Sequence, residues 1–349
     1  MIRINNLEVS NFRGLRNLKF SRFGKVNIFL GENNVGKTSI LEAIFMLTGM
    51  SNPIIPVRMN SFRDEKLRDV PSLKYYFYNT NFRNTPVIKG ESSDRKKRQI
   101  EFAPEFGMSQ LKDDLQLKSS GASLETLPLS GLTLRFKNGS NAYVGRIIDG
   151  DSKISIDHDD KYTERIKTVF IPSTVKDGNA IDSYSELVKR QKKSEIIEMM
   201  QYFDSKIVSL EALSDGLYIQ YEGLDELYPI ALSGDGTRRF FNIVSFVADP
   251  TTDIVMIDEI ETGVHFSAYK KLWKSILTYV RKSDVQVFVT THSKETLACL
   301  SQILQEEAEF DNEDLQVFSL KRYLDGELEA YPITTLGLQG ALENHIELR

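Results

Sequence analysis

The sequence predicts an α/β fold in which buried parallel strands alternate with helices, and three observations support this prediction. A glycine-rich loop at 31–39 lies between an apolar, strand-like run at 25–30 and a helix-like run at 38–47. A second apolar run, at 253–257, ends in two carboxylates, and a third, at 285–290, is followed by a histidine. Continuous apolar runs of this length are typical of strands that are buried on both faces.

The loop GENNVGKTS at 31–39 has the spacing of a Walker A motif. Its glycines let backbone N–H groups approach phosphate oxygens, and the following helix start favours an anion. We expect Lys37 to reach the β- and γ-phosphates of ATP and the Thr38 hydroxyl to ligate Mg²⁺. The predicted nucleotide-binding residues of the loop are Asn33, Asn34, Val35, Gly36, Lys37, Thr38 and Ser39.

The acidic pair Asp258-Glu259 follows the apolar run at 253–257. A parallel strand delivers such side chains to its carboxyl-terminal edge, where ligands bind in α/β sheets. Asp258 is therefore predicted to hold Mg²⁺, usually through water. Glu259 is predicted to orient and deprotonate the attacking water.

His292 follows the apolar run at 285–290, in register with the acidic pair. A histidine at this strand end would face a γ-phosphate and could sense its presence. Single histidines are more often structural, but the chain has only four, and the position of this one favours a catalytic role.

The segment LSGDG at 232–236 precedes an apolar helix predicted at 240–248. Serine and glycine at a helix start present N–H groups and the helix dipole to an anion. Because Walker A already binds this chain's own γ-phosphate, a second such start predicts contact with a nucleotide held by a partner chain. The alternative is a simple helix cap. The predicted contacts are Ser233, Gly234, Asp235 and Gly236.

The order Walker A, signature, Asp-Glu and His resembles the ABC-type ATPase heads of the RecF, SMC and OLD (overcoming lysogenization defect) group. The stretches that resemble standalone AAA-15-type ATPases are GENNVGKTSILEAI, FIPSTVKDGNAIDSYSELV, ALSGDGTRR, IDEIETGVH, VFVTTHSKE and ENHIELR. NFRG at 11–14 resembles the N-terminal strand of the group, which implies that Arg13 binds nucleotide. The resemblance covers nearly the whole chain and is weak between Asn52 and Lys167.

The resemblance also implies a function. Members of the group act in DNA repair and in antiphage defence, as do the ATPase subunits of the PARIS and Septu systems. The implied fold is a P-loop head with a mixed sheet, a β-rich lobe and a helical insertion. The implied cofactors are ATP and Mg²⁺, and the expected hydrolysis is slow.

The chain departs from its relatives in three ways. OLD nucleases carry a Toprim nuclease domain after the ATPase, whereas only a short stretch follows His292, so any nuclease is expected to be a separate protein. SMC heads are split by coiled coils, but repeated prolines and the lack of heptads exclude long arms here. Gln99 and Gln110 are poorly placed for the glutamine loop of transporters and SMC heads.

One ABC-type head is expected over residues 1–349. Its predicted parts are a β-rich lobe with Walker A at about 1–170, a helical and β insertion at about 182–230, the signature, Walker B and His segment at about 231–310, and C-terminal strands and a helix at 311–349. Further helices are predicted at 182–203, 264–281, 294–304 and 336–349.

Composition is that of an ordinary globular protein, with 41% hydrophobic and 27% charged residues and a net charge of −5. No run is long enough to span a membrane, the N-terminus lacks a signal-peptide core, and the single Cys299 suits a reducing compartment, so we expect a cytoplasmic protein without a membrane partner. Basic runs at 94–98 and 189–193 leave DNA open as a partner, although solvated surface is the favoured interpretation.

Two functions remain after these arguments. The first is an ATP-gated sensor or scaffold of an antiphage defence system, acting with a separate effector nuclease. The second is a RecF-like DNA-repair ATPase that clamps DNA. In both, the expected assembly is a homodimer or higher homo-oligomer bridged by ATP. A transporter subunit is disfavoured by IDEIETGVH and by the missing glutamine loop.

Overall fold

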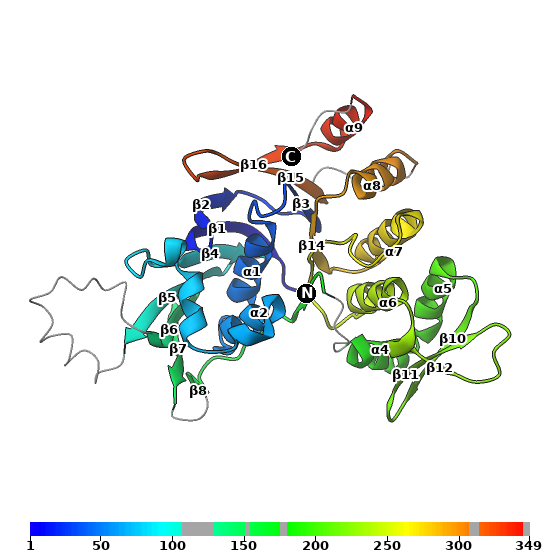
Figure 1. Cartoon of the computed structure of the whole chain (residues 1–349), viewed down its shortest axis with the longest axis horizontal. Coiled ribbons are helices and arrows are strands. Elements are labelled where there is room, and N and C mark those ends of the chain that lie inside the picture. The colour runs from blue at the N-terminus through cyan, green and yellow to red at the C-terminus, as the bar shows by residue number, and fades with distance from the viewer. Residues whose placement is uncertain (107–128, 151–153, 175–179, 307–313, 345–349) are drawn as a thin grey trace, which may run out of the picture.

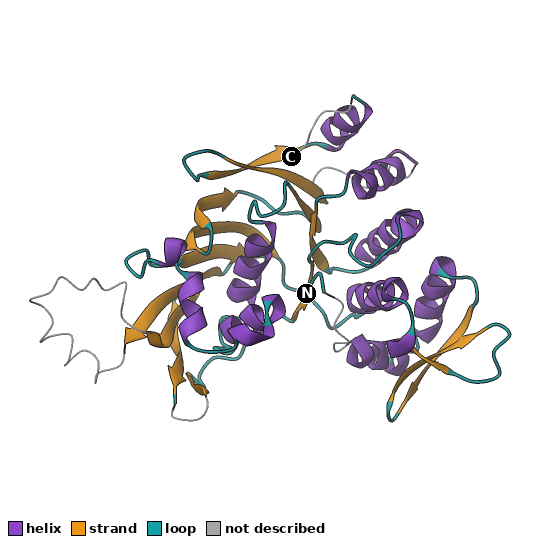
Figure 2. Ribbon diagram, viewed as in Figure 1, coloured by secondary structure: helices purple, strands orange, loops and turns teal. Residues whose placement is uncertain are grey.

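The computed structural model describes residues 1–106, 129–150, 154–174, 180–306 and 314–344. These residues form three sheets and the helices that cover them (Figures 1 and 2). A six-stranded sheet has the order β16-β15-β3-β14-β13-β9, and all of its pairings are parallel except that of β15 with β16. Its strands are β3 (Val26–Leu30), β9 (Thr168–Ile171), β13 (Ile254–Ile257), β14 (Gln286–Thr291), β15 (Leu315–Arg322) and β16 (Leu328–Ile333).

A seven-stranded antiparallel sheet has the order β2-β1-β4-β5-β6-β7-β8. Its strands are β1 (Ile4–Phe12), β2 (Leu15–Phe20), β4 (Val87–Ser92), β5 (Lys97–Phe106), β6 (Leu129–Asn138), β7 (Asn141–Asp149) and β8 (Ile154–His158). A small third sheet contains β10 (Ile207–Leu213), β11 (Gly216–Tyr221) and β12 (Tyr228–Pro229).

Two hydrophobic cores lie on the two faces of the six-stranded sheet. The first joins one face of that sheet to the seven-stranded sheet and to α1 (Lys37–Thr48) and α2 (Ile55–Arg63). The second joins the other face to the remaining described helices, most of which stand in a row beside it (Figure 1). These helices are α4 (Ala180–Lys189), α5 (Lys193–Phe203), α6 (Asp235–Ala248), α7 (Tyr269–Lys282), α8 (Lys294–Glu306) and α9 (Thr335–Glu343). Because both faces are covered, β13 and β14 are buried along their whole length, as their apolar runs predicted.

Some predicted helix boundaries were wrong. The helix predicted at 182–203 is two helices, α4 and α5, because the chain turns at 190–192, where Gln191 has a φ of 60°. The helix predicted at 264–281 begins only at Tyr269, after a short 3₁₀ turn at Phe266–Ala268. The helix predicted at 240–248 begins earlier, at Asp235, so its first turn contains part of the signature segment.

The predicted β-rich lobe at about 1–170 contributes strands to two different sheets. β3 and β9 lie within the predicted β-rich lobe, yet both belong to the six-stranded sheet, together with β13 and β14. Walker A and Walker B are therefore carried by the same sheet. Among the described helices the longest, α6 and α7, have 14 residues, so this part of the chain has no long coiled coil.

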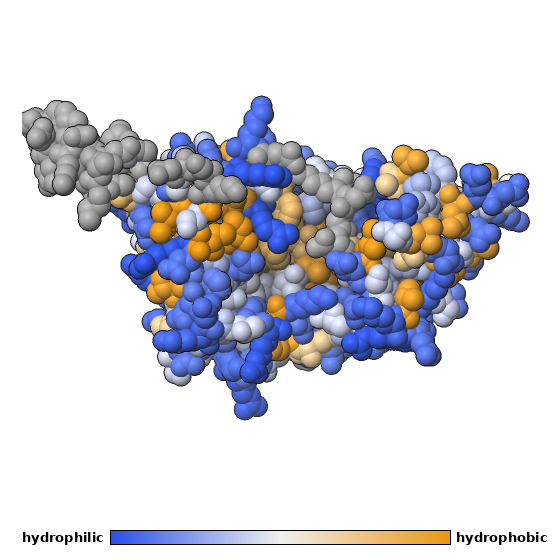
Figure 3. Space-filling model, turned by 90° about the horizontal axis from the view of Figure 1, so that it is seen from below, coloured by the Kyte–Doolittle hydropathy of each residue, from blue (hydrophilic) through white to orange (hydrophobic). Residues whose placement is uncertain are grey.

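No helix in the described ranges has the length and apolar character needed to cross a membrane. Figure 3 shows mostly hydrophilic side chains on the face seen from below, with smaller apolar areas on both halves of the molecule.

Candidate nucleotide-binding site

The Walker A loop connects β3 to α1, and its backbone requires its glycines. Gly31 and Gly36 have φ angles of 155° and 121°. A Cβ atom on Gly31 would lie only 2.9 Å from a methyl carbon of Val35 and 3.1 Å from the carbonyl oxygen of Leu320. Arg322 of β15 braces the loop by donating to the carbonyl oxygen of Val35 at 2.9 Å. The loop is thus a tight backbone cradle of the kind that binds phosphate.

Lys37 is 5% exposed, and its side chain folds over the loop. Its ammonium donates to the carbonyl oxygens of Gly31 and Glu32, both at 2.8 Å. These neutral acceptors hold the charge at the loop, close to the N-terminus of α1. A triphosphate in this cradle would offer the same ammonium stronger, charged acceptors.

Asp258, at the end of β13, meets Thr38 in the first turn of α1. The Thr38 hydroxyl lies 3.0 and 3.1 Å from the two carboxylate oxygens, and the Thr290 hydroxyl donates to one of them at 2.7 Å. Burial raises the pKa of Asp258, and the hydrogen bonds from Thr290 and Thr38 oppose that shift. A hydroxyl beside a carboxylate is an oxygen donor set that suits Mg²⁺, so these residues fit the implied metal.

Glu259 has a φ of 48°, which is uncommon for a residue with a side chain. This backbone turn is held by its own N–H, which donates to the Thr290 hydroxyl at 2.8 Å. The side chain is 34% exposed, and Thr262 donates to one of its oxygens at 3.3 Å. Glu259 therefore remains accessible to water beside the metal donors, as a general base must.

His292 follows β14 directly and lies next to Glu259. Its Nδ1 atom is 3.9 Å from a carboxylate oxygen of Glu259 and 3.0 Å from one of Glu261. The structure thus brings Lys37, Thr38, Asp258, Glu259 and His292 to one edge of the six-stranded sheet. Sequence reasoning missed Glu261, although its place two residues after Glu259 in IETG was a signal.

The signature segment forms the start of α6. Gly234 is the N-cap residue and is exposed, and a Cβ atom there would meet nothing within 4 Å. The Ser233 hydroxyl is buried and has no hydrogen-bond partner among the described residues. Gly236 packs against the turn after Walker B, since a Cβ atom on it would lie 3.1 Å from the carbonyl oxygen of Gly263. Asp235, the first residue of α6, is exposed and pairs with Arg238.

A buried arginine of α6 was also missed. Arg239 is 1% exposed and donates to the main-chain oxygens of Asp258 at 2.7 Å, of Glu259 at 3.2 Å, and of Pro172. Burial lowers its pKa to about 10, against the opposing effect of nearby carboxylates. Arg239 therefore ties the signature helix to the backbone of Walker B.

Arg13 lies behind Walker A in a buried network. Its guanidinium donates to Glu42 of α1 and to Asn60 of α2, both at 2.8 Å, and lies 3.9 Å above the ring of Tyr76. Arg63 donates to the same Glu42 at 2.8 Å. The structure thus shows Arg13 in contact with Glu42, Asn60 and Tyr76, and its role as a nucleotide contact stays a prediction. Of the two glutamines weighed for a glutamine loop, Gln99 lies in β5 of the other sheet and Gln110 lies outside the described residues.

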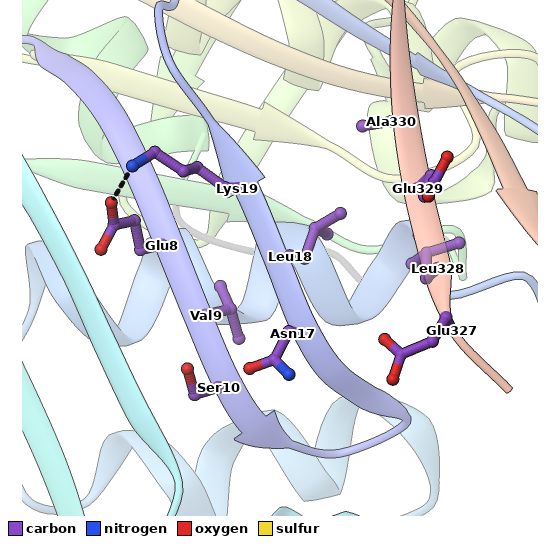
Figure 4. Close-up of a pocket in the computed structure, with 10 residues that line it drawn as sticks. All are labelled: Glu8, Val9, Ser10, Asn17, Leu18, Lys19, Glu327, Leu328, Glu329 and Ala330. Atoms are coloured by element: carbon purple, nitrogen blue, oxygen red, sulfur yellow. Dashed lines mark ion pairs between the residues drawn. The ribbon is translucent and has the colours of Figure 1, made fainter.

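This network predicts a large loss of stability in Glu42→Ala. Breaking a buried ion pair by removing one partner costs about 3–5 kcal/mol, because the largely buried Arg13 side chain is left without its carboxylate countercharge. Urea unfolding should report this loss. The control is Lys19→Ala. Lys19 pairs with Glu8 on the neighbouring strand (Figure 4), and the two side chains are 69% and 47% exposed, respectively. Because this ion pair is exposed to solvent, its loss should change the free energy of unfolding by no more than about 1 kcal/mol. Equal losses in both variants would contradict the importance of the network.

The pH dependence of stability should follow the same group. Burial pushes the pKa of Glu42 upward, but the guanidinium groups of Arg13 and Arg63 outweigh it, and the net pKa is lowered. A lowered folded-state pKa contributes stability above the ordinary pKa of glutamate and loses it as the pH falls. Lowering the pH from neutral should therefore reduce the free energy of unfolding of the wild type by more than it reduces that of Glu42→Ala.

The chain is similar to several known proteins. The model of the family described as "AAA domain, putative AbiEii toxin, Type IV TA system" matches residues 26–298. A protein of Helicobacter pylori described as an ATP/GTP phosphatase is 24% identical over 342 residues, covering 87% of this chain and 89% of the relative. RecF of Clostridioides difficile is 40% identical over 47 residues, which is 14% of this chain and 13% of RecF.

The match to a solved structure covers more of this chain than the match to the Helicobacter protein does. The SMC head domain with an extended coiled coil from Pyrococcus furiosus, bound to the C-terminal domain of ScpA, has a TM-score of 0.50 at 12% identity, covering 99% of this chain and all of that one. This likeness shows the fold. The chain has the α/β fold of an ABC-type P-loop ATPase head, with the mixed sheet that the motifs predicted.

Proposed function

The chain belongs to the AAA-domain family that carries this description, and on that premise we propose that it is a slow, Mg²⁺-dependent ATPase whose copies are bridged by nucleotide. The observation that carries the proposal is the contact between the Thr38 hydroxyl and the Asp258 carboxylate, with Glu259 beside it. Two motifs that are far apart in sequence, Walker A and the Asp258-Glu259 pair, meet there, and their meeting supports phosphoryl transfer to water. The printed description of the Helicobacter relative, an ATP/GTP phosphatase, supports the same chemistry.

Each residue has a distinct role in the proposed reaction. Lys37 and the loop N–H groups bind the β- and γ-phosphates, and Thr38 and Asp258 hold Mg²⁺, which neutralises phosphate charge. Glu259 takes a proton from the attacking water, and His292 lies at the same edge to sense the γ-phosphate. Ser233 and Gly234 contact the γ-phosphate bound by a second copy.

At the level of the cell, we propose a sensor or scaffold subunit of an antiphage defence system, acting in the cytoplasm with a separate effector nuclease. The family description supports this placement, because it names a toxin–antitoxin system. In this proposal the chain is one ATPase head, with Walker A, the insertion after β9 and the signature-to-histidine segment acting as its parts.

A pull-down experiment tests for a nuclease partner. Tagged Glu259→Gln protein is isolated in the presence of ATP from cells that carry the neighbouring genes, and the proteins bound to it are identified.

The alternative is a RecF-like ATPase that clamps DNA, and the local match to RecF favours it. The two basic runs give it little support. Lys96 pairs with Asp94, and the buried Arg98 pairs with Glu164. In the second run Lys193 pairs with Glu211. Fluorescence anisotropy with labelled duplex DNA, with and without ATP, separates the proposals, since only a clamp gains DNA affinity from ATP.

Lys37→Ala tests the Walker A assignment. Losing a charge-assisted contact with phosphate should weaken ATP binding by about 1.5–3 kcal/mol, or roughly tenfold to hundredfold. Titration with a fluorescent ATP analogue measures this change, and Lys19→Ala removes an exposed lysine as the matched control. Equal affinity in the two variants would place the nucleotide elsewhere.

A further inference from the structure

Glu261 is a buried carboxylate that the proposed reaction does not use. It is 9% exposed and lies on the loop after β13, facing the end of β14. One oxygen, Oε1, accepts a hydrogen bond from the main-chain N–H of His292 at 2.9 Å and lies 3.0 Å from Nδ1 of the same residue. The other oxygen, Oε2, is buried and has no hydrogen-bond partner among the described residues.

Stability does not explain a glutamate at this position. A buried carboxylate with an unpartnered oxygen costs free energy of folding, because that oxygen loses its water without replacement. The residue also adds negative charge beside Asp258 and Glu259. Residues that lower the stability of the folded protein in this way are expected at functional sites, where they are kept for their function.

The contacts of Glu261 fix the imidazole of His292 in two ways. The bond to the main chain holds the end of β14, and the carboxylate beside Nδ1 limits the rotation of the ring. An ionised carboxylate can only accept a hydrogen bond, so the tautomer with a proton on Nδ1 is favoured. Nε2 is then the acceptor nitrogen of the ring, which can take a hydrogen bond from a water molecule, and Glu259 lies 3.9 Å from Nδ1.

We propose that Glu261 is a positioning residue, which sets the orientation and tautomer of His292 beside the general base Glu259. The inference rests on the proposed ATP hydrolysis, because it assigns Glu261 a part in that reaction. It also explains why two glutamates with different burial occur in IDEIETG. The exposed Glu259 faces water, and the buried Glu261 holds the histidine.

Double-mutant kinetics test this role. Glu261→Ala should lower kcat for ATP roughly tenfold to hundredfold, as misplacing a catalytic group does, with little change in ATP affinity. Glu261→Gln should restore most of the rate lost in Glu261→Ala, because the amide oxygen can accept the bond from the main-chain N–H of His292 and lie beside Nδ1 as Oε1 does. In a His292→Ala background, Glu261→Ala should have no further effect, since the group it positions is absent. A full additional loss in that background would overturn the proposal, as would a Glu261→Gln protein as slow as Glu261→Ala.

A second measurement is independent of turnover. The chain has four histidines, so ¹⁵N NMR of the imidazole nitrogens is tractable, and the spectrum of His292→Ala assigns the signal. We expect Nδ1 of His292 to carry the proton in the wild type and in Glu261→Gln, and the tautomers to mix in Glu261→Ala. An unchanged His292 signal in a folded Glu261→Ala protein would overturn the positioning role. A wild type that lacks ATPase activity but shows the expected tautomers would instead reject the proposed function.

Discussion

Glu259→Gln should slow ATP hydrolysis by roughly 10²- to 10⁴-fold, which is the usual contribution of a general base, while ATP binding is retained. The amide has nearly the same shape as the carboxylate but cannot accept the proton of the attacking water. Binding should persist because the Walker A loop, Lys37 and the Thr38–Asp258 contact are unaltered. Single-turnover hydrolysis of radiolabelled ATP separates the chemical step from product release.

A matched control uses the same chemical change at an exposed position. Glu226 is exposed in the loop before β12, and the Glu226→Gln protein should hydrolyse ATP at the wild-type rate. If Glu259→Gln also kept that rate, the base would have to be another group, and the 3.9 Å approach of His292 would make that residue the next to test. If Glu259→Gln lost ATP binding as well, the residue would serve the site's structure.

The arrangement of the nucleotide site followed from local patterns in the sequence. Each motif lies directly after an apolar run, and such runs become buried parallel strands whose carboxyl ends share one edge. β3, β14 and β13 are neighbours in this order, so Thr38 meets Asp258 and His292 lies beside Glu259. The roles given to these side chains stay predictions, since contacts alone do not demonstrate chemistry.

What the sequence could not supply depends on contacts between distant segments. Glu42 resembles an ordinary helix residue until the fold buries it against Arg13, which the sequence predicts to bind nucleotide and not a carboxylate of the same chain. Arg239 could have been a solvated arginine on α6, but it reaches the Walker B backbone because α6 packs against that strand. The position of β9 at the edge of the six-stranded sheet was equally hidden, since its run of four residues is too short to be assigned to one sheet from the sequence.

The second large effect concerns assembly. Ser233→Arg should abolish ATP-driven association while leaving ATP binding by the single chain nearly intact. One chain supplies one Walker A loop and one signature segment, and these are carried by α1 and α6, which pack on opposite faces of the six-stranded sheet. The signature of a second copy can complete the site, because Gly234 is exposed at the start of α6 and a Cβ atom there would meet nothing within 4 Å. The Ser233 hydroxyl beside it is buried and has no hydrogen-bond partner among the described residues. Leu232, the residue before Ser233, is apolar and 67% exposed, which suits a protein contact.

Sedimentation velocity on the Glu259→Gln background measures this effect without consuming the nucleotide. ATP should enlarge the particle and ADP should not, because only the γ-phosphate extends to the partner, and mass action then favours the bridged form. Ser233→Arg places a bulky cation where that phosphate would lie, so the shift should disappear. Ser140→Arg adds the same side chain at the exposed β6–β7 turn and should assemble normally. A Ser233→Arg protein that still assembled with ATP would reduce the signature segment to a helix cap. Full assembly without nucleotide would instead mean that ATP rearranges a standing interface, because association would then draw its free energy from protein contacts alone.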